Sequence, residues 1–465
     1  MKNSAQWLIL LLAPGFLAGC MVGPNYHRPI VTPPAAFRGA DATPGPSLGD
    51  EHWADVFPDE QLRALIGTAL RQNYDARIAA TRVLEAQAAL GIVRADQLPQ
   101  VDMAAGASRE RAAAAIEPFR TPAYQTSVLQ VGPTARWEPD FWGKFRRATE
   151  AARAELTATE WGRRAVVTSL VAQVAGGYFE LRALDLDLDI ARRTLVSRQE
   201  SLRLTEVRAD RGATSALDVR QAEQLVFDAT STIADLERQI VQQENAISVL
   251  LGNDPGDVPR GRSLIEEPHA PELPLGLPSA LLQRRPDIVE AEQRLVAANA
   301  NIGVARAKYF PEISLTGAGG FQSAALTDLF TGPAGFWSVG AAALQPIFTG
   351  GRLKSQVVLA QAQRDEAELA YEQVIRQSFR DVADALVAYR KGREYSEQQE
   401  LLLRSAEDAR RLTTRRYEGG ASSYLEVLDS ETRLFAAQIG TSQAHLRELL
   451  ALVQVYRSLG GGWIQ

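Results

Sequence analysis

The chain has 465 residues, of which 46% are apolar, and its formal net charge is −6 at pH 7. The apolar fraction is ample for a packed core, and an acidic balance without a long run of Lys or Arg argues against a nucleic-acid partner. Cys20 is the single cysteine, which excludes an intramolecular disulfide.

The N-terminus carries a short apolar segment that predicts export. This segment, Trp7 to Ala18, follows Lys2 and is too short to cross a bilayer, which needs about 20 apolar residues. Residues 1–19 are therefore predicted to be a signal peptide. The sequence LAGC that ends at Cys20 resembles a bacterial lipobox, whose cysteine is acylated and becomes the mature N-terminus. The alternative is a stray cysteine in an ordinary signal peptide.

Two proline-free windows predict long helices. All 23 prolines lie outside residues 140–254 and 347–465, and a proline inside a helix costs about 3 kcal/mol. The first window predicts a helix from Lys144 to Arg211, a stop at Gly212 and a return helix from Ser215 to Leu251. The second window predicts the same arrangement, with a long helix over Arg352–Tyr417, a stop at Gly419 and Gly420, and a return helix over Ser423–Leu459.

The turns between these helices have nearly the same sequence. RGATSALDV at 211–219 returns as GGASSYLEV at 419–427, and the offset is 420 − 212 = 208 residues. A shorter helix is predicted before each window, at Asp75–Leu98 and Asp287–Phe310, and the return helices carry apolar residues at coiled-coil spacing. The chain is therefore predicted to contain two copies of one helical unit.

Between the short and the long helix of each copy the sequence alternates with period two. The candidate strands are VDMAAGASRE (101–110), YQTSVLQVGPTARW (124–137), PEISLTGAGGFQ (311–322) and FWSVGAAALQPIF (336–348). Segments of about ten residues with this weak alternation are typical of transmembrane β-strands, although soluble hairpins share the pattern. After residue 20 no stretch qualifies as a transmembrane helix.

Four strands from one chain are too few to close a barrel. An open sheet edge in lipid leaves unpaired backbone groups, each at a cost of several kcal/mol, and the smallest membrane barrels have about eight strands. Three copies would supply 3 × 4 = 12 strands. The predicted fold is therefore mainly α with a transmembrane β part, in which a homotrimer forms a 12-stranded β-barrel above a tunnel of coiled-coil helices.

Several motifs in this order resemble the TolC-like outer-membrane efflux proteins, specifically their OprM/NodT lipoprotein branch. The motifs are CMVGPNYHRP (20–29), LLQRRPDIVEAEQRLVAANANIGVARAKYFP (281–311), QPIFTGGR (345–352) and LGGGW (459–463). The resemblance covers nearly the whole chain. It implies a TolC-like trimeric α/β barrel in the outer membrane of a Gram-negative bacterium, with diacylglycerol and palmitate on Cys20 and the helical tunnel in the periplasm.

The resemblance also implies a domain organisation. Segments 20–74 and 254–285 are expected to form an equatorial belt, to which the tail 461–465 is added. Repeat 1 then spans residues 75–253, with its β-hairpin at about 100–138 and its helical tip near residue 212. Repeat 2 spans residues 286–460, with its β-hairpin at about 312–348 and its tip near residue 420.

The function implied by the resemblance is that of a passive exit duct. Similar proteins export drugs and other toxic small molecules for an inner-membrane transporter of the resistance-nodulation-division (RND) class, to which a periplasmic adaptor (membrane fusion) protein couples them. The alternatives are a duct for protein or metal-ion export and a structural envelope lipoprotein without a pore.

The helix-tip turns carry the candidate gate. Similar channels are closed there by polar contacts and acidic rings, and the matching positions are Asp218, Tyr417, Glu426 and Asp429. Asp218 with Ser215, and Glu426 with Ser423, also fit capping boxes, in which the acid accepts a hydrogen bond from the N-cap amide. Asp429 lies beyond the reach of a cap and is the first gate candidate, with a solvated helix face as the alternative. Tyr417 is predicted to donate to Asp218 across the neighbouring helix pair, or else to be a simple helix-end aromatic.

The turn residues themselves are predicted to contact the adaptor. They are Gly212, Ala213, Thr214, Ser215, Gly419, Gly420, Ala421 and Ser422. Some relatives have an arginine where Ser422 stands, so a salt-bridged latch is not predicted from that position, although Arg415 or Arg416 could replace it.

Catalytic and cofactor motifs are missing from the sequence. It contains no HExxH, Walker A or GxSxG element, so no enzymatic activity, metal or cofactor is predicted. LDLDLDI (184–190) begins like a calcium loop, but Ile190 replaces the required glycine and Val196 the closing Glu. This stretch is predicted to be a helix surface. GAGGF (317–321) is predicted to be a run of small residues in a strand.

Overall fold

The computed structural model describes residues 21–38, 47–113, 124–267, 273, 276 and 278–463. The chain divides into two compact units: unit 1 takes 1–30, 83–158 and 291–371, and unit 2 takes 31–82, 159–290 and 372–465. Each unit contains segments of both sequence repeats. The predicted signal peptide, the predicted lipidation site Cys20 and the last two residues of the predicted C-terminal tail lie outside the described residues.

The elements alternate between helices and strand pairs in the predicted order. The helices are α2 (Trp53–Val56), α3 (Glu60–Gln72), α4 (Tyr74–Ala95), α5 (Lys144–Asp210), α6 (Ala216–Leu250), α7 (Pro278–Arg284), α8 (Pro286–Ala307), α9 (Arg352–Glu418) and α10 (Tyr424–Ser458). The strands are β1 (Gln100–Ala112), β2 (Tyr124–Trp137), β3 (Glu312–Ser323) and β4 (Gly335–Leu344). The prediction of four strands and two long helices, each with a return helix, is confirmed.

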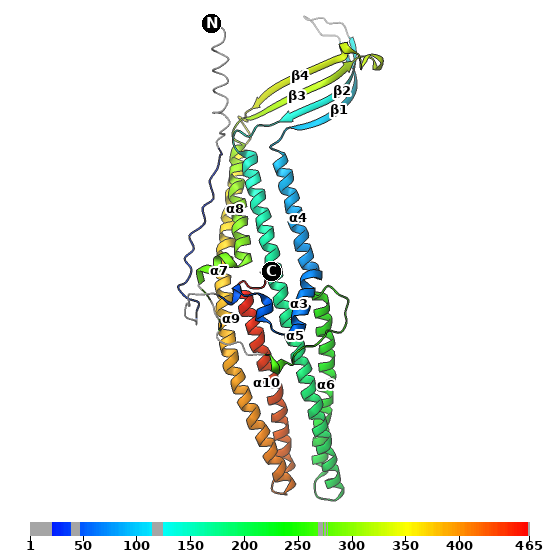
Figure 1. Cartoon of the computed structure of the whole chain (residues 1–465), viewed down its shortest axis with the longest axis vertical. Helices are drawn as coiled ribbons and strands as arrows, with labels where there is room; N and C mark the ends of the chain where they lie inside the picture. Colours follow the sequence, from blue (N-terminus) through cyan, green and yellow to red (C-terminus); the bar gives the residue numbers. More distant parts are fainter. Residues whose placement is uncertain are drawn as a thin grey trace. The chain divides into compact units, whose positions relative to one another are not determined.

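Unit 1 contains one antiparallel sheet in the order β1-β2-β3-β4. β1 and β2 pair over their whole length, from Gln100 opposite Arg136 to Ala112 opposite Tyr124. Figure 1 shows the four strands as one curved sheet. β1 and β4 form its two edges, and the side chains of 100–111 in β1 are exposed on both faces.

Glycines allow β2 and β3 to approach closely. A Cβ atom on Gly132 would lie 1.9 Å from the carbonyl oxygen of Gly319, and Gly320 has φ +147°, a conformation that residues with a side chain rarely adopt. Pro133, which has no N–H to donate, lies at the same level of β2. The GAGGF stretch therefore lies inside a strand, as predicted, and close packing requires its glycines.

Small residues also form a core between the helices of unit 1. Ala151 and Ala154 of α5 are buried against Ala297 and Ala300 of α8. Alanine side chains let two helix backbones come close together with little loss of side-chain entropy. The alanine-rich sequence of both helices is thus explained by their contact.

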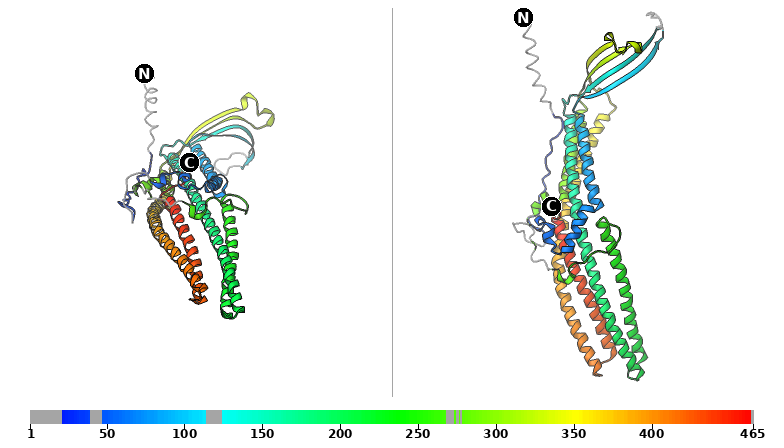
Figure 2. Two further views of the ribbon diagram at one scale, coloured as in Figure 1. Left: turned by 60° about the horizontal axis from the view of Figure 1, so that its bottom comes forward. Right: turned by 45° about the vertical axis from the view of Figure 1, so that its right-hand side comes forward.

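Unit 2 contains two helical hairpins. Figures 1 and 2 show α5 beside α6 and α9 beside α10. Gln243 of α6 donates to the carbonyl of Gly177 on α5 at 2.9 Å, and Thr441 of α10 donates to Gln399 on α9 at 3.3 Å. A buried aromatic group that includes Phe57 and Tyr456, with ring centroids 5.8 Å apart, belongs to the main core of this unit.

The LDLDLDI stretch lies within α5, but it is only partly a helix surface. Asp189 is exposed and pairs with Arg193 at 3.1 Å. Asp187 is buried, and it accepts a hydrogen bond of 2.8 Å from Gln443 on α10. Burial raises the pKa of the Asp187 carboxyl. The surface prediction is therefore wrong for Asp187, because the helix that covers it comes from a segment far away in the sequence.

No helix in the described part of the chain has both the length and the apolar content that a membrane crossing needs.

Candidate functional site: the two helix-tip turns

Both tips end on glycine in the left-handed conformation. Gly212 has φ +71° and Gly420 has φ +74°, and the amide after each glycine bonds back over a full helical turn. Ala213 donates to Arg208 and Ala421 donates to Arg416, each at 2.8 Å. This is the helix C-cap that glycine favours. The sequence repeat is thus a repeat of backbone geometry.

The first tip forms the predicted capping box. Ser215 caps α6, and the Asp218 carboxylate accepts hydrogen bonds from the Ser215 amide at 3.0 Å and the Ser215 hydroxyl at 2.9 Å. Thr214 also donates to it. These bonds from Thr214 and the Ser215 amide hold the pKa of Asp218 below its usual value. The Asp218 carboxylate is therefore occupied in ending the turn.

The second tip does not form its predicted capping box. Ser423 is the N-cap of α10, but its side chain makes no capping hydrogen bond. The Glu426 side chain is exposed and has no hydrogen bond or ion pair with any described residue. Glu reaches further than Asp, and here its carboxylate stays in solvent. The box prediction is wrong at this tip, and Glu426 carries an unneutralised negative charge.

Asp429 lies one turn further along α10, in contact with a cation of its own helix. The Nε of Arg433 is 2.7 Å from the Asp429 carboxylate, and both side chains are largely exposed. Asp429, Glu426 and Arg433 line a groove of about 570 Å³ between α9 and α10. Its walls carry small residues such as Ala406 and Ser430. Arg433 was not among the residues predicted from the sequence, although its i, i+4 spacing from Asp429 indicates the pair.

Tyr417 packs within an aromatic cluster. Its ring lies 5.6 Å from the ring of Tyr424, and the guanidinium of Arg208 lies 4.3 Å from its centroid. The Tyr417 hydroxyl is buried and has no hydrogen-bond partner among the described residues. The predicted bond from Tyr417 to Asp218 is therefore not formed within the chain. Burial, together with the charge of Glu431, raises the pKa of Tyr424 to about 12.

Arg416 contacts the turn at the second tip, but it does not form the salt bridge that was considered for a substitute arginine. Its Nη2 donates to the carbonyl of Ala421 in the turn at 3.3 Å, so it stabilises the turn and forms no ion pair there. Ser422 has a buried hydroxyl without a partner among the described residues. The exposed turn residues on either side of it, Gly420 and Ser423, remain accessible to a partner.

A buried polar layer, which was not predicted from the sequence, joins the two hairpins about two turns from the tips. Glu431 of α10 is 7% exposed and accepts a hydrogen bond from Ser201 of α5 at 3.2 Å. Burial raises the pKa of the Glu431 carboxyl, and Arg410 opposes this rise. Arg198 of α5 is also buried, and it bonds to Asp228 of α6 at 3.0 Å. The sequence does carry a signal for this layer, because Glu431 is a charged residue inside the apolar stripe of the return helix.

In unit 1, the residues that follow Cys20 are held by a buried arginine. Arg147 of α5 donates to the carbonyls of Val22 and Gly23, each at 3.3 Å, and to the side chain of Asn25 at 2.8 Å. The Val22 amide donates to the carbonyl of Trp142 at 3.1 Å. Residue 21 is thereby held where β2 gives way to α5.

Comparison with known proteins identifies the class. The family described as "Outer membrane efflux protein" matches residues 65–253 and 277–461. OprJ of Pseudomonas aeruginosa is 36% identical over 466 residues, which cover 100% of this chain and 97% of OprJ. The toluene efflux pump outer membrane protein TtgF of Pseudomonas putida is 37% identical over 458 residues, which cover 96% of this chain and 95% of TtgF.

The third relative is the cation efflux system protein CusC of Escherichia coli. It is 34% identical over 453 residues, which cover 97% of each chain. A crystal structure of CusC matches the present structure with a TM-score of 0.85 at 33% identity, covering 95% of this chain and 100% of that one.

The four-stranded sheet and the paired long helices define a TolC-like outer-membrane channel. The chain belongs to the outer membrane efflux protein family, and it is an outer-membrane channel component of an efflux pump.

Proposed function

We propose that this chain forms a homotrimeric, lipid-anchored exit duct, through which an inner-membrane pump expels small toxic molecules. The energy comes from the pump, which we expect to be of the RND class, and the duct itself is passive. A periplasmic adaptor joins the two. The relatives that act in toluene and cation efflux support this role.

The observation that carries the proposal is that the edge strands β1 and β4 each have one side that pairs with no other described strand. Both faces of β1 are exposed, and its apolar residues Val101 and Met103 lie on one of them. Successive strands are antiparallel, so β4 of one copy is suited to pair antiparallel with β1 of the next copy. Since lipid does not tolerate unpaired backbone groups, the sheet must close through other copies. Three copies give 3 × 4 = 12 strands.

The anchor and the adaptor contact rest on separate features. Residue 21 is held at the end of β2, beside the exposed sheet, which is a suitable place for an acyl group on Cys20 to enter the membrane. At the tips, Leu217 and Leu425 occupy equivalent positions of the two repeats and are 64% and 60% exposed. Exposed leucines beside polar turns are suited to protein contact. We propose that these turns receive the adaptor.

Metal-ion export is the second candidate function. CusC supports it, and so do the exposed acids Glu426 and Asp429 in the groove at the second tip. Transport of metal ions and of organic dyes by cells that carry the cognate pump separates the two candidates.

The test is the assembly and conductance of the mature protein. Its mass in mild detergent should be that of three chains with bound acyl groups, and planar bilayers should show discrete channels. Cys20→Ser should lose the acyl mass and keep the conductance. A monomer without channel activity would overturn the duct. A photo-crosslinker at residue 213 or 421, both exposed in the turns, should capture the adaptor in cells, and one at the exposed mid-helix position 384 should not.

A further inference from the structure

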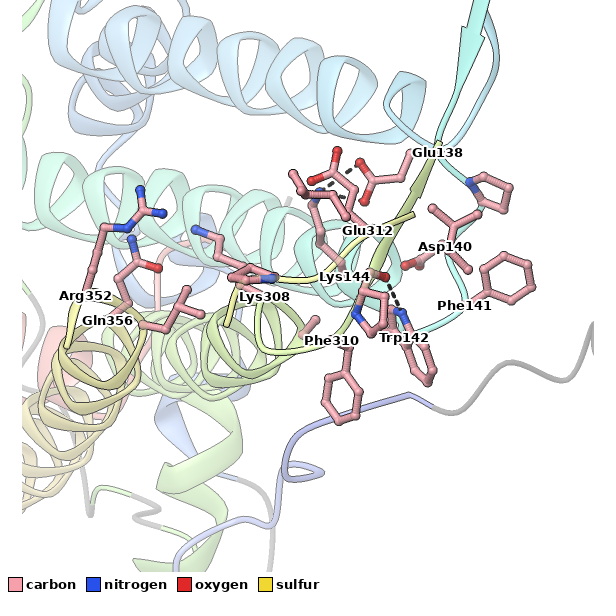
Figure 3. A pocket seen from close by; sticks show the side chains of 17 residues that line it. Glu138, Asp140, Phe141, Trp142, Lys144, Lys308, Phe310, Glu312, Arg352 and Gln356 are labelled. Atoms are coloured by element: carbon pink, nitrogen blue, oxygen red, sulfur yellow. Dashed lines mark hydrogen bonds and ion pairs between the residues drawn. The ribbon is translucent and has the colours of Figure 1, made fainter. Parts of the chain in front are cut away.

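A cavity of about 350 Å³ lies in unit 1, where the strands give way to the helices. Its charged lining residues are Glu138, Asp140, Lys144, Lys308, Glu312 and Arg352. Figure 3 shows Arg352 and Gln356 at one end of this cavity and Glu138, Asp140 and Trp142 towards the other. The charges therefore come from segments on both sides of the sheet's periplasmic end, and no part of the duct function described above uses them.

Half of these charges are already neutralised. Lys144 bonds to both oxygens of Glu138, at 2.8 and 3.0 Å, and Asp140 pairs with Arg146 at 3.2 Å. The side chains of Lys308, Arg352 and Glu312 are exposed and have no hydrogen bond or ion pair with other described residues. The cavity thus offers two cations and one carboxylate to a ligand.

An aromatic pair borders the same cavity. The rings of Trp142 and Phe310 are stacked with centroids 4.8 Å apart, and the Trp142 indole N–H donates to the carbonyl of Pro311 at 2.8 Å. Tryptophan favours the level of lipid headgroups because it joins an apolar ring to a polar N–H. The Val22 amide bonds to the Trp142 carbonyl, so the N-terminal segment that we expect to be acylated lies beside this pair.

A buried acceptor completes the set. The side-chain oxygen of Gln356 is buried and has no hydrogen-bond partner in the described part of the chain. A buried acceptor without a partner destabilises the protein, and a donor on a ligand would satisfy it. Gln356 lies at the Arg352 end of the cavity in Figure 3, away from Glu312, and is a second acceptor for a ligand donor at that end.

We propose that this cavity binds the headgroup of a phospholipid whose phosphodiester carries a primary ammonium. Lys308 and Arg352 hold the phosphodiester by charge-assisted hydrogen bonds, and Glu312 accepts from the ammonium. The lipid is the occupant, in preference to free phosphate, because the Trp142–Phe310 pair supplies an apolar side on which the glycerol and acyl chains can lie. The inference rests on the membrane position given by the proposed function.

The test counts the lipids that the mature trimer retains. Nanodiscs with equal parts of phosphatidylethanolamine, phosphatidylglycerol and phosphatidylcholine are used, and native mass spectrometry identifies the lipids after release. The wild type should retain phosphatidylethanolamine about tenfold over phosphatidylcholine, whose quaternary ammonium cannot donate hydrogen bonds. Lys308→Gln/Arg352→Gln should lose most retention of all three lipids. Lys354→Gln is the matched control, because Lys354 is exposed on α9 outside the cavity.

Glu312→Gln tests the ammonium contact separately. It should keep the phosphodiester-dependent retention and lose most of the preference for phosphatidylethanolamine over phosphatidylcholine. Equal retention by the double variant and by Lys354→Gln overturns the site. Displacement of the lipid by millimolar inorganic phosphate overturns the lipid as occupant. Shielding of Lys308 from an amine reagent in lipid-free trimer also overturns it, because a neighbouring copy then fills the cavity.

Channel conductance of the same samples keeps this inference apart from the proposed function. If the wild type conducts but retains no lipid, only the headgroup site is contradicted. If the wild type forms no channel, the proposed duct is contradicted, whatever lipid the protein retains.

Discussion

The guanidinium Nε of Arg433 lies 2.7 Å from the carboxylate of Asp429, one helical turn away on α10. Asp429, the first gate candidate from the sequence, is therefore paired with a cation of its own helix and is not a bare charge at the tip. Among the candidate gate acids, Glu426, one turn closer to the tip, is the one without a side-chain partner among the described residues. If three copies meet at the tip, the negative potential there depends on Glu426 and on the balance between Asp429 and Arg433.

We therefore expect opposite effects from the two members of the pair. Arg433→Gln releases the charge of Asp429 and should raise the preference of the channel for cations, whereas Asp429→Ala leaves Arg433 unpaired and should lower it. Glu426→Gln should lower it as well. Reversal potentials in planar bilayers under a salt gradient measure the preference, and these differences should shrink at high salt because of screening.

Arg238→Gln is the control for the charge change, because Arg238 forms a similar exposed pair with Asp235 in the middle of α6. An unaltered reversal potential in all three tip variants would contradict the gate assignment.

The tip glycines test the repeated turn. Gly420→Ala should destabilise the tip by about 1 kcal/mol, because φ +74° disfavours a Cβ atom. The added methyl meets nothing within 4 Å, so the cost should stop there. Gly252, which also has a positive φ but follows the C-terminal end of α6 away from the tips, is the comparison. Gly252→Ala should lower the stability more, since its Cβ would lie 2.5 Å from the carbonyl oxygen of Gln72. Hydrogen exchange of the flanking amides measures both, and equal protection in the two variants would be contrary to this reasoning.

The sequence predicts the parts of this fold that depend on local rules. The absence of proline predicts α5 and α9, and glycine predicts where they end. The apolar alternation predicts the ends of the four strands to within four residues. The capping box at Ser215 and Asp218 was also predictable. The capping box predicted for Ser423 and Glu426 does not form, because a cap needs a particular side-chain rotamer as well as the right residue types.

Contacts between distant segments were beyond reach of the sequence. Asp187 is buried because Gln443, 256 residues later, lies against it. The Lys308 and Arg352 pair lines one cavity only after the strands have brought α8 and α9 together. Periodicity shows which residues share a face of one helix, but it does not say which other helix covers that face.

A buried carboxyl in unit 2 predicts a pH effect. Burial, reinforced by the nearby charge of Asp59, raises the pKa of Glu267 to about 7. The Arg262 and Arg182 charges oppose this rise. The folded form therefore binds a proton that the unfolded chain, with its pKa near 4.5, releases. Stability from this group is fully present below pH 4.5 and is lost as the pH rises through about 7.

Glu267→Gln should remove this dependence. Above pH 7 the variant should melt at a higher temperature than the wild type, and the difference should vanish at low pH. Thermal unfolding of the detergent-solubilised protein from pH 4 to pH 8 measures it. Asp257→Asn, at an exposed site nearby, is the control. A variant that melts lower than the wild type at pH 8 would show that the ionised carboxylate is the stabilising form.

The N-terminal segment offers the last prediction, because one buried side chain holds most of it. Arg147 has 1% of its side chain exposed and donates to Val22, Gly23 and Asn25. Lysine at this position keeps the charge, but its single nitrogen cannot occupy the separate positions from which Nε and Nη2 of Arg147 make these bonds. Arg147→Lys should cost about 3 kcal/mol locally, and residues 21–25 should exchange their amides faster and become sensitive to protease.

The matched control is Arg153→Lys, because Arg153 is exposed on the same helix. The sheet should stay protected in both variants, since its backbone bonds do not involve Arg147. Unchanged protection of residues 21–25 in Arg147→Lys would mean that other bonds suffice to hold the segment. The bonds in question are Asn299 to the Pro24 carbonyl at 3.1 Å and Val22 to Trp142. In that case residues 21–25 are positioned by Asn299 of α8 and by Trp142, and Arg147 serves only the packing of α5.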